Sequence, residues 1–289
     1  MAVTRTFHKW LLGKEIEYMI RRAGVTQMQA ANVIEVAQSK MANLIAGRGA
    51  ISVGDLERLA NALGFTDSGY QEKLLDLRRD NSRRGCWSTG YMKAYAPEIR
   101  LRIGAEKSAD RIRSVEIEVV PGLLQCESYV RALYAGAPDV GALTHDDRVD
   151  ARMARQDIFD RENPPVLQFV LSESCLRRVM GDAAVMREQS EYIVKLSERP
   201  NLMVQVLPFR SASRRRTLTW DRFTLLRVQS PGAAGQLELG YVEGVTGIRY
   251  VDDKDALSAY DLAWSRLSAA ALSFEESREF VREVAHEFR

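Results

Sequence analysis

Apolar residues in the first eighty positions recur with helical spacing, in short runs that are separated by glycine or by helix-capping residues. A first helix is predicted over residues 7–23, and Gly24 should end it because glycine readily adopts a left-handed conformation. The apolar face of this helix is formed by Leu12, Ile16, Met19 and Ile20. It should pack across the helices that follow.

Residues 26–47 predict two short helices that meet at a tight turn. Thr26 can cap the first helix, since its hydroxyl accepts a backbone N–H that has no intrahelical partner, and Gly47 can end the second. Ala31 is small at the expected crossing point, so the helices can pack at a steep angle. The apolar side chains expected between the helices are those of Ala30, Ala31, Ile34, Met41, Leu44 and Ile45.

The outer face of the second helix, residues 37–45, carries neutral polar side chains and one lysine. These side chains are Gln38, Ser39, Lys40 and Asn43. Amides pair bidentately with adenine, hydroxyls pair with several bases, and lysine pairs with guanine or phosphate, so this face suits the DNA major groove. An ordinary helical hairpin with a solvated polar face would show the same periodicity.

Two further helices complete the first domain. Ser52, with Asp55 three residues later, forms a capping-box start for a helix that should stop at Gly64. Tyr70, Leu74 and Leu77 continue the apolar pattern into a fifth helix. The sequence therefore predicts an all-α domain of five helices over residues 1–80, followed by a polar linker over residues 81–95.

Residues 26–47 resemble the helix-turn-helix of the Xre/Cro-type repressor family. The matching residues are Thr26, Gln27, Ala31, Val36, Leu44 and Gly47. This resemblance implies that Gln27 and Arg48 hold phosphates, while Gln38, Ser39 and Asn43 face bases. The chain departs from the family at Glu35, where glycine is usual in the turn, and at Met41, where a β-branched residue is usual.

Beyond the linker, residues 96–289 predict a separate and larger mixed α/β (α+β) domain. Strands are expected over residues 115–120, 166–171, 202–207, 219–228, 236–242 and 247–251. Helices are expected over residues 123–136, 144–161 and 182–199, and two more close the chain. The second closing helix should begin at the Ser273/Glu276 capping box.

This second part resembles a domain of unknown function that follows an Xre-type helix-turn-helix in many bacterial regulators. The matching segments are residues 121–125, 127–133, 198–201, 204–209, 241–244, 271–273 and 276–277. The resemblance implies a transcription regulator of development or secondary metabolism. It also implies a small partner protein encoded nearby, in an arrangement similar to toxin-antitoxin pairs.

Charge and composition agree with a DNA-binding arm on an ordinary soluble protein. The 289-residue chain is 46% hydrophobic and 28% charged, with a net charge of +2. Its first fifty residues hold seven Lys or Arg and three Glu, which makes this segment +4 and the remainder −2. The sequence has neither a long apolar run nor an apolar leader, so we expect a cytoplasmic protein without membrane contact.

The sequence favours no catalytic, metal or cofactor site. Its three histidines stand outside metal-ligand spacings, and the three distant cysteines fit structural thiols. A carboxylate site is conceivable at Asp146, Asp147, Asp150, Asp252, Asp253 and Asp255. Asp146 and Asp147 are better explained as first-turn residues that complement a helix dipole. The acidic residues from Asp252 to Asp255 are expected to open the next helix in the same way. We therefore expect a protein that is not an enzyme.

The expected function is sequence-specific binding of double-stranded DNA by a homodimer, with the second domain used for dimerisation and for control by the small partner protein. An alternative is a ligand-sensing receptor whose second domain binds a small-molecule effector. Arg214, Arg215 and Arg216, near Trp220, could bind an anionic ligand or stack on a base. A solvated loop explains them more simply.

Overall fold

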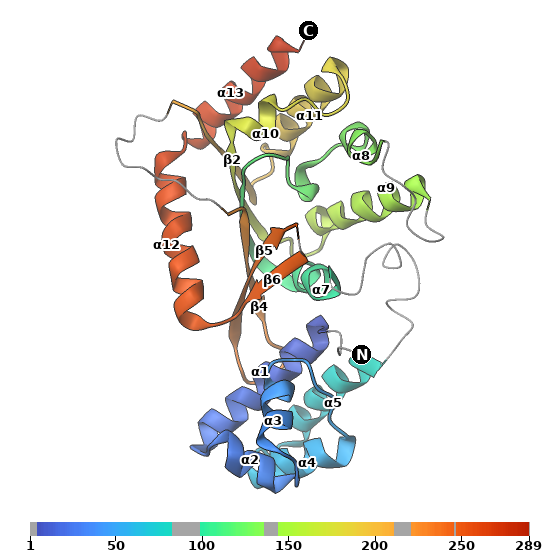
Figure 1. Ribbon diagram of the computed structural model, residues 1–289, viewed down its shortest axis with the longest axis vertical. Coiled ribbons are helices and arrows are strands. Elements are labelled where there is room, and N and C mark those ends of the chain that lie inside the picture. The colour runs from blue at the N-terminus through green and yellow to red at the C-terminus, as the bar shows by residue number, and fades with distance from the viewer. Residues whose placement is uncertain (1–4, 83–98, 136–143, 211–220, 246, 289) are drawn as a thin grey trace. The chain divides into compact units, whose positions relative to one another are not determined.

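The chain divides into two compact units in the computed structural model. The first unit comprises Met1–Ser108 and Val228–Leu237, and the second comprises Ala109–Arg227 and Glu238–Arg289. The structure describes residues 5–82, 99–135, 144–210, 221–245 and 247–288. Residues 83–95 of the predicted linker lie outside the described part. A helical region followed by a mixed α/β region confirms the predicted fold class (Figure 1).

Five helices begin the first unit, as the sequence predicts. They are α1 (Phe7–Ala23), α2 (Gln27–Val33), α3 (Gln38–Ile45), α4 (Val53–Ala62) and α5 (Ser68–Ser82). Gly24, after α1, has φ 69°, and the hydroxyl of Ser52 accepts the backbone N–H of Asp55 at the start of α4. The predicted stop at Gly24 and the predicted cap at Ser52 are therefore confirmed.

The long helix α1 forms the centre of the first unit and packs against α3, α5 and α7 (Arg100–Ser108). Trp10, Ile16 and Met19 of α1 are fully buried. Gly104 allows α7 to approach α1 closely, because a Cβ at this position would lie 2.5 Å from the Cβ of Phe7. A single core therefore fixes the helices around α1.

The second unit is built on a six-stranded sheet with the order β3-β2-β1-β4-β5-β6. The strands are β1 (Ala109–Glu116), β2 (Val166–Ser172), β3 (Leu202–Leu207), β4 (Phe223–Gln229), β5 (Gln236–Gly244) and β6 (Gly247–Val251). β1, β2 and β3 run parallel, whereas β5 and β6 are antiparallel. The sheet is thus mixed.

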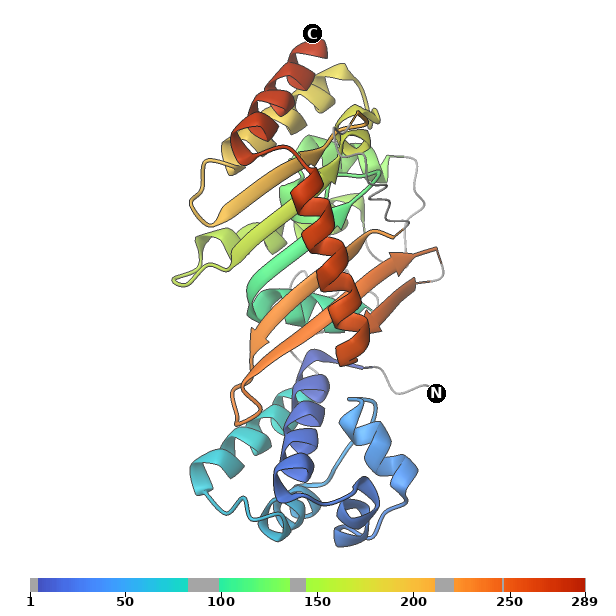
Figure 2. The same ribbon diagram turned by 90° about the vertical axis from the view of Figure 1, so that its left-hand side faces the viewer.

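Helices cover both faces of this sheet. They are α8 (Glu127–Tyr134), α9 (His145–Met153), α10 (Glu173–Arg177), α11 (Ala183–Leu196), α12 (Lys254–Ala270) and α13 (Phe274–Glu287), with short 3-10 helices η3 (Gly122–Leu124) and η4 (Ala154–Asp160). α12 lies on one face, and α8 and α9 lie on the other (Figure 1). Figure 2 shows α12 crossing the strands. Trp264 and Leu267 of α12 are buried on a cluster that includes Val115 and Phe223.

The structure corrects the predicted strand over residues 115–120, because β1 occupies Ala109–Glu116 instead. Along β1, Arg111 and Arg113 alternate with the buried residues Ile112 and Ser114. Because the alternate positions are charged, the segment lacks the apolar content from which a strand is predicted. Helices α7 and α10 are not predicted from the sequence. α7 is rich in charge, and α10 has only five residues, too few to show a helical period.

Candidate nucleic-acid interface

Helix α2 begins in a complete capping box. The hydroxyl of Thr26 accepts the backbone N–H of Gln29 at 3.2 Å, and the side chain of Gln29 accepts the backbone N–H of Thr26 at 2.8 Å. Two backbone donors at the start of α2 are satisfied by this exchange. The predicted cap at Thr26 is confirmed, and it fixes where the first helix of the pair begins.

The packing between α2 and α3 follows the predicted apolar faces. Ala30, Ala31 and Ile34 are buried on the α2 side. Met41 and Leu44 are buried on the α3 side, whereas Ile45 is only half-buried. The flexible thioether chain of Met41 therefore fills the position that a β-branched residue usually occupies in the resembling family.

The C-terminal end of α3 lies directly against the backbone of α1. A Cβ on Gly13 of α1 would stand 2.3 Å from the carbonyl oxygen of Ile45. Gly47, which has φ 69°, also lies close to α1, since its Cβ would be 2.9 Å from Cα of Trp10. The left-handed end predicted at Gly47 is confirmed. Two glycines thus permit backbone contact that fixes α3 on α1.

The turn between α2 and α3 has unusual backbone geometry. Glu35, the position where glycine is usual in the resembling family, has φ 54°, and it is the sole non-glycine residue with positive φ in the described part of the chain. A side chain in this conformation costs roughly 1–2 kcal/mol. Arg58 of α4 lies 3.7 Å from the carboxylate of Glu35, and both side chains are largely exposed, so their attraction offsets little of this cost.

Replacing Glu35 with glycine should therefore stabilise the first unit by up to about 1 kcal/mol, because the relief of strain exceeds the chain entropy that glycine loses on folding. Denaturant unfolding followed by circular dichroism would measure this. Arg58→Gln is the matched control, since it removes the ion pair and leaves the turn residue in place. A variant E35G that unfolds more easily than the wild type would show that the carboxylate holds the turn.

The outward face of α3 carries the side chains that were predicted to read bases. Gln38, Ser39, Lys40 and Asn43 are all exposed. Within the described residues, none of these four side chains makes a hydrogen bond or an ion pair with the protein. Their donors and acceptors are therefore available to a ligand, while the opposite face of α3 is used for packing.

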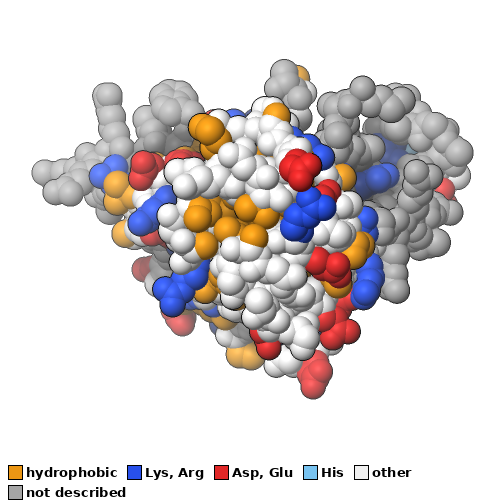
Figure 3. Space-filling view, turned by 90° about the horizontal axis from the view of Figure 1, so that it is seen from below, with side chains coloured by type: hydrophobic (Ala, Val, Ile, Leu, Met, Phe, Trp, Pro, Cys, Tyr) orange, Lys and Arg blue, Asp and Glu red, His pale blue; other side chains and the backbone are white. Residues whose placement is uncertain are grey.

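The surroundings of this face are mixed in chemistry rather than uniformly basic. Gln27 at the start of α2 and Arg48 after α3 are exposed, and their side chains make no hydrogen bond or ion pair within the described residues. Figure 3, which views the molecule from below Figure 1, shows Lys and Arg side chains and Asp and Glu side chains scattered around a surface of neutral and apolar groups. Met28 of α2 has an exposed apolar side chain, at 57%. Such a surface can combine a few phosphate contacts with neutral base contacts.

Sequence reasoning missed a buried carboxylate in the first unit. Glu15 of α1 is 0% exposed and is surrounded by hydrogen-bond donors from α5 and from the segment between β4 and β5. A signal was present, because Glu15 stands three residues after Leu12 and four before Met19 and so lies within the apolar stripe. A charged residue at such a position indicates a buried partner.

In the second unit, four of the six acidic residues that could form a carboxylate site lie at the starts of helices. Asp146 and Asp147 lie in the first turn of α9, where Asp147 completes a capping box with Thr144. Asp253 caps α12, and Asp255 lies in its first turn. Within the described residues, no group of three or more His, Cys, Asp or Glu is placed to hold a metal ion. Arg214, Arg215, Arg216 and Trp220 lie outside the described part.

The residues 121–125 that carry the second resemblance sit in a buried network of amide side chains. Gln125 donates to the carbonyl of Val120 at 2.6 Å. Gln189 of α11 donates to the carbonyl of Leu124 at 2.7 Å and accepts the backbone N–H of Cys126 at 2.9 Å. These bonds satisfy main-chain groups in a segment with little regular structure. The motif therefore has a structural role.

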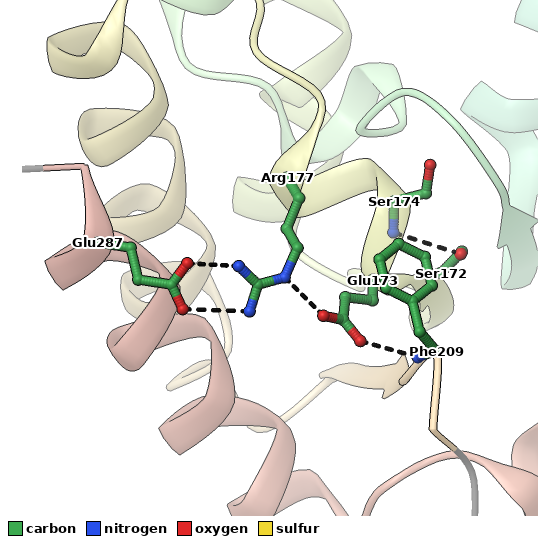
Figure 4. A network of polar contacts seen from close by, with 6 residues as sticks. All are labelled: Ser172, Glu173, Ser174, Arg177, Phe209 and Glu287. Carbon is green, nitrogen blue, oxygen red and sulfur yellow. Dashed lines mark hydrogen bonds and ion pairs between the residues drawn. The ribbon is translucent and has the colours of Figure 1, made fainter.

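A second network lies where β2 and β3 end (Figure 4). Glu173 accepts from Nε of Arg177 at 2.5 Å and from the backbone N–H of Phe209 at 2.7 Å. Arg177 also pairs with Glu287 of α13, and this ion pair lowers the pKa of Glu287. The polar groups shown in Figure 4 thus tie the strand ends to the last helix.

Cys175 is buried beside this network. Burial, followed by the nearby carboxylates of Glu116 and Glu118, raises the pKa of its thiol well above the usual range. The thiol therefore stays protonated at neutral pH, in which form it is a poor nucleophile. Cys126 is also a buried free cysteine. Both agree with the predicted structural thiols.

A helix pair with a polar exposed face on its second helix, held in a small helical unit, is the arrangement found in helix-turn-helix domains. The helix-turn-helix domain family matches residues 12–69. This domain indicates a DNA-binding regulator rather than an enzyme.

The larger part of the chain matches a second family, described as "Domain of unknown function (DUF5753)", over residues 99–283. The match covers more than half of the chain, and the protein belongs to this family. Neither the curated proteins nor the solved structures include a match to the chain. In the part of the chain that the structure describes, every helix is too short or too polar to cross a membrane.

Proposed function

We propose that this protein is a sequence-specific transcription regulator that reads the DNA major groove with α3. The observation that carries the proposal is the set of exposed polar side chains on α3, Gln38, Ser39, Lys40 and Asn43, which have no protein partner within the described residues. In this arrangement Gln38 and Asn43 pair with adenine edges, and Lys40 pairs with guanine or phosphate. Gln27 and Arg48 contact phosphates on either side.

The packing of α3 supports this role. Met41 and Leu44 are buried, so the reading face cannot rotate without exposing them. Glycines at positions 13 and 47 hold the end of α3 against α1. A helix fixed in this way presents its polar side chains in one orientation, which base recognition requires.

The experiment that tests this proposal is selection of binding sites from a random DNA pool by the full-length protein, followed by sequencing. The expected result is enrichment of a short motif, arranged as a palindrome with half-sites about one helical turn, roughly 34 Å, apart. Retained DNA that shows no enriched motif would contradict sequence-specific reading.

We further propose that the protein acts as a homodimer in which residues 1–80 bind DNA and residues 96–289 provide dimerisation and control. One recognition helix contacts only a few base pairs, whereas two linked helices combine their affinities on one site. A small partner protein encoded nearby is the proposed controller.

A small-molecule effector is the alternative, and the structure offers a groove between α11 and α13. It is lined by Arg187, Glu191, Val194, Arg282, Ala285 and His286, and its volume is about 230 Å³. Small-molecule sites usually occupy about 300–1,000 Å³, so this groove is small for an effector. Thermal unfolding of the full chain distinguishes partner binding from effector binding, because a ligand raises the unfolding temperature of the folded protein that it binds. The measurement is made with the partner protein and, separately, with metabolite pools.

A further inference from the structure

The carboxylate of Glu15 is enclosed by four donors from two distant parts of the chain. Tyr70 of α5 donates its hydroxyl to Oε2 at 2.8 Å. The backbone N–H of Ala233 donates to Oε2 at 3.0 Å, and that of Ala234 donates to Oε1 at 3.0 Å. Ser230 donates its hydroxyl to Oε1. Every one of these groups belongs to the first unit.

The segment that supplies three of these donors is shaped to receive a carboxylate. The backbone N–H of Ser230 donates to the carbonyl of Gly235 at 2.8 Å, which closes residues 230–235 into a loop. Gly235 has φ 73°. A Cβ on Gly232 would lie 2.5 Å from Cδ of Glu15, so only glycine leaves room for the carboxylate here. Successive backbone N–H groups that converge in this way make a site for an anion.

The four hydrogen bonds to the Glu15 carboxylate depend on one another for an electrostatic reason. A carboxylate that is buried away from solvent is stabilised only by its hydrogen-bond donors. Removal of the 230–235 loop would take away three of these four donors at once. Burial, together with the hydrogen bond to Glu15, also raises the pKa of the Tyr70 hydroxyl, so this donor stays protonated. Loss of the loop would therefore remove most of the hydrogen bonds that stabilise this carboxylate.

Glu15 stands two residues from Gly13, the position where α1 touches the carbonyl of Ile45 at the end of α3. We propose that Glu15 and Ser230 are positioning residues, which clamp α1 to the 230–235 loop and so hold α3 in the orientation that reads DNA. This inference rests on the proposed function.

The two halves of the clamp come from different family matches. Glu15 lies within residues 12–69 of the helix-turn-helix domain, and Ser230 lies within residues 99–283 of the DUF5753 match. The helix-turn-helix match therefore contains none of the four donors to its own buried carboxylate. Tyr70 lies one residue beyond the match, and the other three donors, those of Ser230, Ala233 and Ala234, come from the sequence of the larger domain.

The test compares Glu15→Gln, Ser230→Ala and the double variant in the full chain, with Glu17→Gln as the matched control. Glu17 is on the same helix but forms an i,i+3 ion pair with Lys14, and its side chain is 47% exposed. Fluorescence anisotropy measures the affinity for the selected DNA site and for random DNA, at a temperature where circular dichroism shows every variant folded. Hydrogen exchange follows residues 38–47 and 230–235.

Each clamp variant should lose about tenfold or more in affinity for the selected site, while affinity for random DNA changes by less than about threefold. The double variant should lose no more than the worse single variant, and exchange should rise in both segments. A purely structural role would lower both affinities together. Unchanged affinity for the selected site in E15Q and S230A would overturn the clamp. Absence of any preferred site for the wild type would overturn the proposed function and, with it, the role of the clamp in reading.

Discussion

Gly13→Ala should destabilise the first unit by about 1–3 kcal/mol and disturb the recognition helix. The added Cβ would stand 2.3 Å from the carbonyl oxygen of Ile45 and 2.7 Å from that of Leu44. Neither backbone atom can swing aside, so α1 and α3 must separate. The higher helix propensity of alanine relative to glycine offsets at most about 1 kcal/mol of this loss. Denaturant unfolding measures the loss, and hydrogen exchange shows whether it is centred on residues 38–47.

Gly54→Ala is the matched control for this substitution. Gly54 is also a helical glycine, in α4, but a Cβ there meets nothing within 4 Å. Alanine at position 54 should therefore stabilise the first unit by about 0.5–1 kcal/mol. The two substitutions have opposite expected signs. Equal effects would show that the contact between α1 and α3 is looser than the distances indicate.

Gln189→Leu should destabilise the second unit by about 2–6 kcal/mol. Gln189 is 1% exposed, and its amide bonds both the carbonyl of Leu124 and the backbone N–H of Cys126. Leucine has a similar size but leaves both buried main-chain groups without a partner, at a cost of about 1–3 kcal/mol each. Thermal unfolding measures the effect, and hydrogen exchange should locate it in residues 122–134.

Glu191→Ala controls for helix α11 itself. Glu191 is exposed, and its side chain has no hydrogen bond or ion pair within the described residues. Its replacement should change stability by less than about 0.5 kcal/mol. If Q189L were as mild as E191A, the amide network around residues 121–125 would have no structural role.

The first unit could be predicted closely from sequence because its signals are local. The hydroxyls of Thr26 and Ser52 cap the helices that follow them, and Gly24 and Gly47 both have φ 69°. Each of these signals depends on the side chain or backbone of one residue and its near neighbours. The element bounds therefore follow from the residues themselves.

Contacts between distant residues could not be predicted in this way. Glu15 and Ser230 are 215 positions apart, and no local pattern pairs them. Arg113 of β1 lies on the face covered by α12, where it pairs with Asp261, so its charge reflects a neighbour that the local sequence does not reveal. The bounds of β1 are shifted for the same reason, since its partners rather than its own apolar content define the strand.

A competition titration with the double variant Gln38→Ala and Asn43→Ala shows directly whether α3 reads base sequence. Labelled DNA carrying the selected site is displaced by unlabelled site or by random DNA, for the wild type and for the variant. Both side chains are exposed and outside the core, so the fold should be unchanged. We predict that preference for the selected site falls on the order of tenfold or more while affinity for random DNA is nearly intact. An unchanged preference would contradict the assignment of α3 as the reading helix.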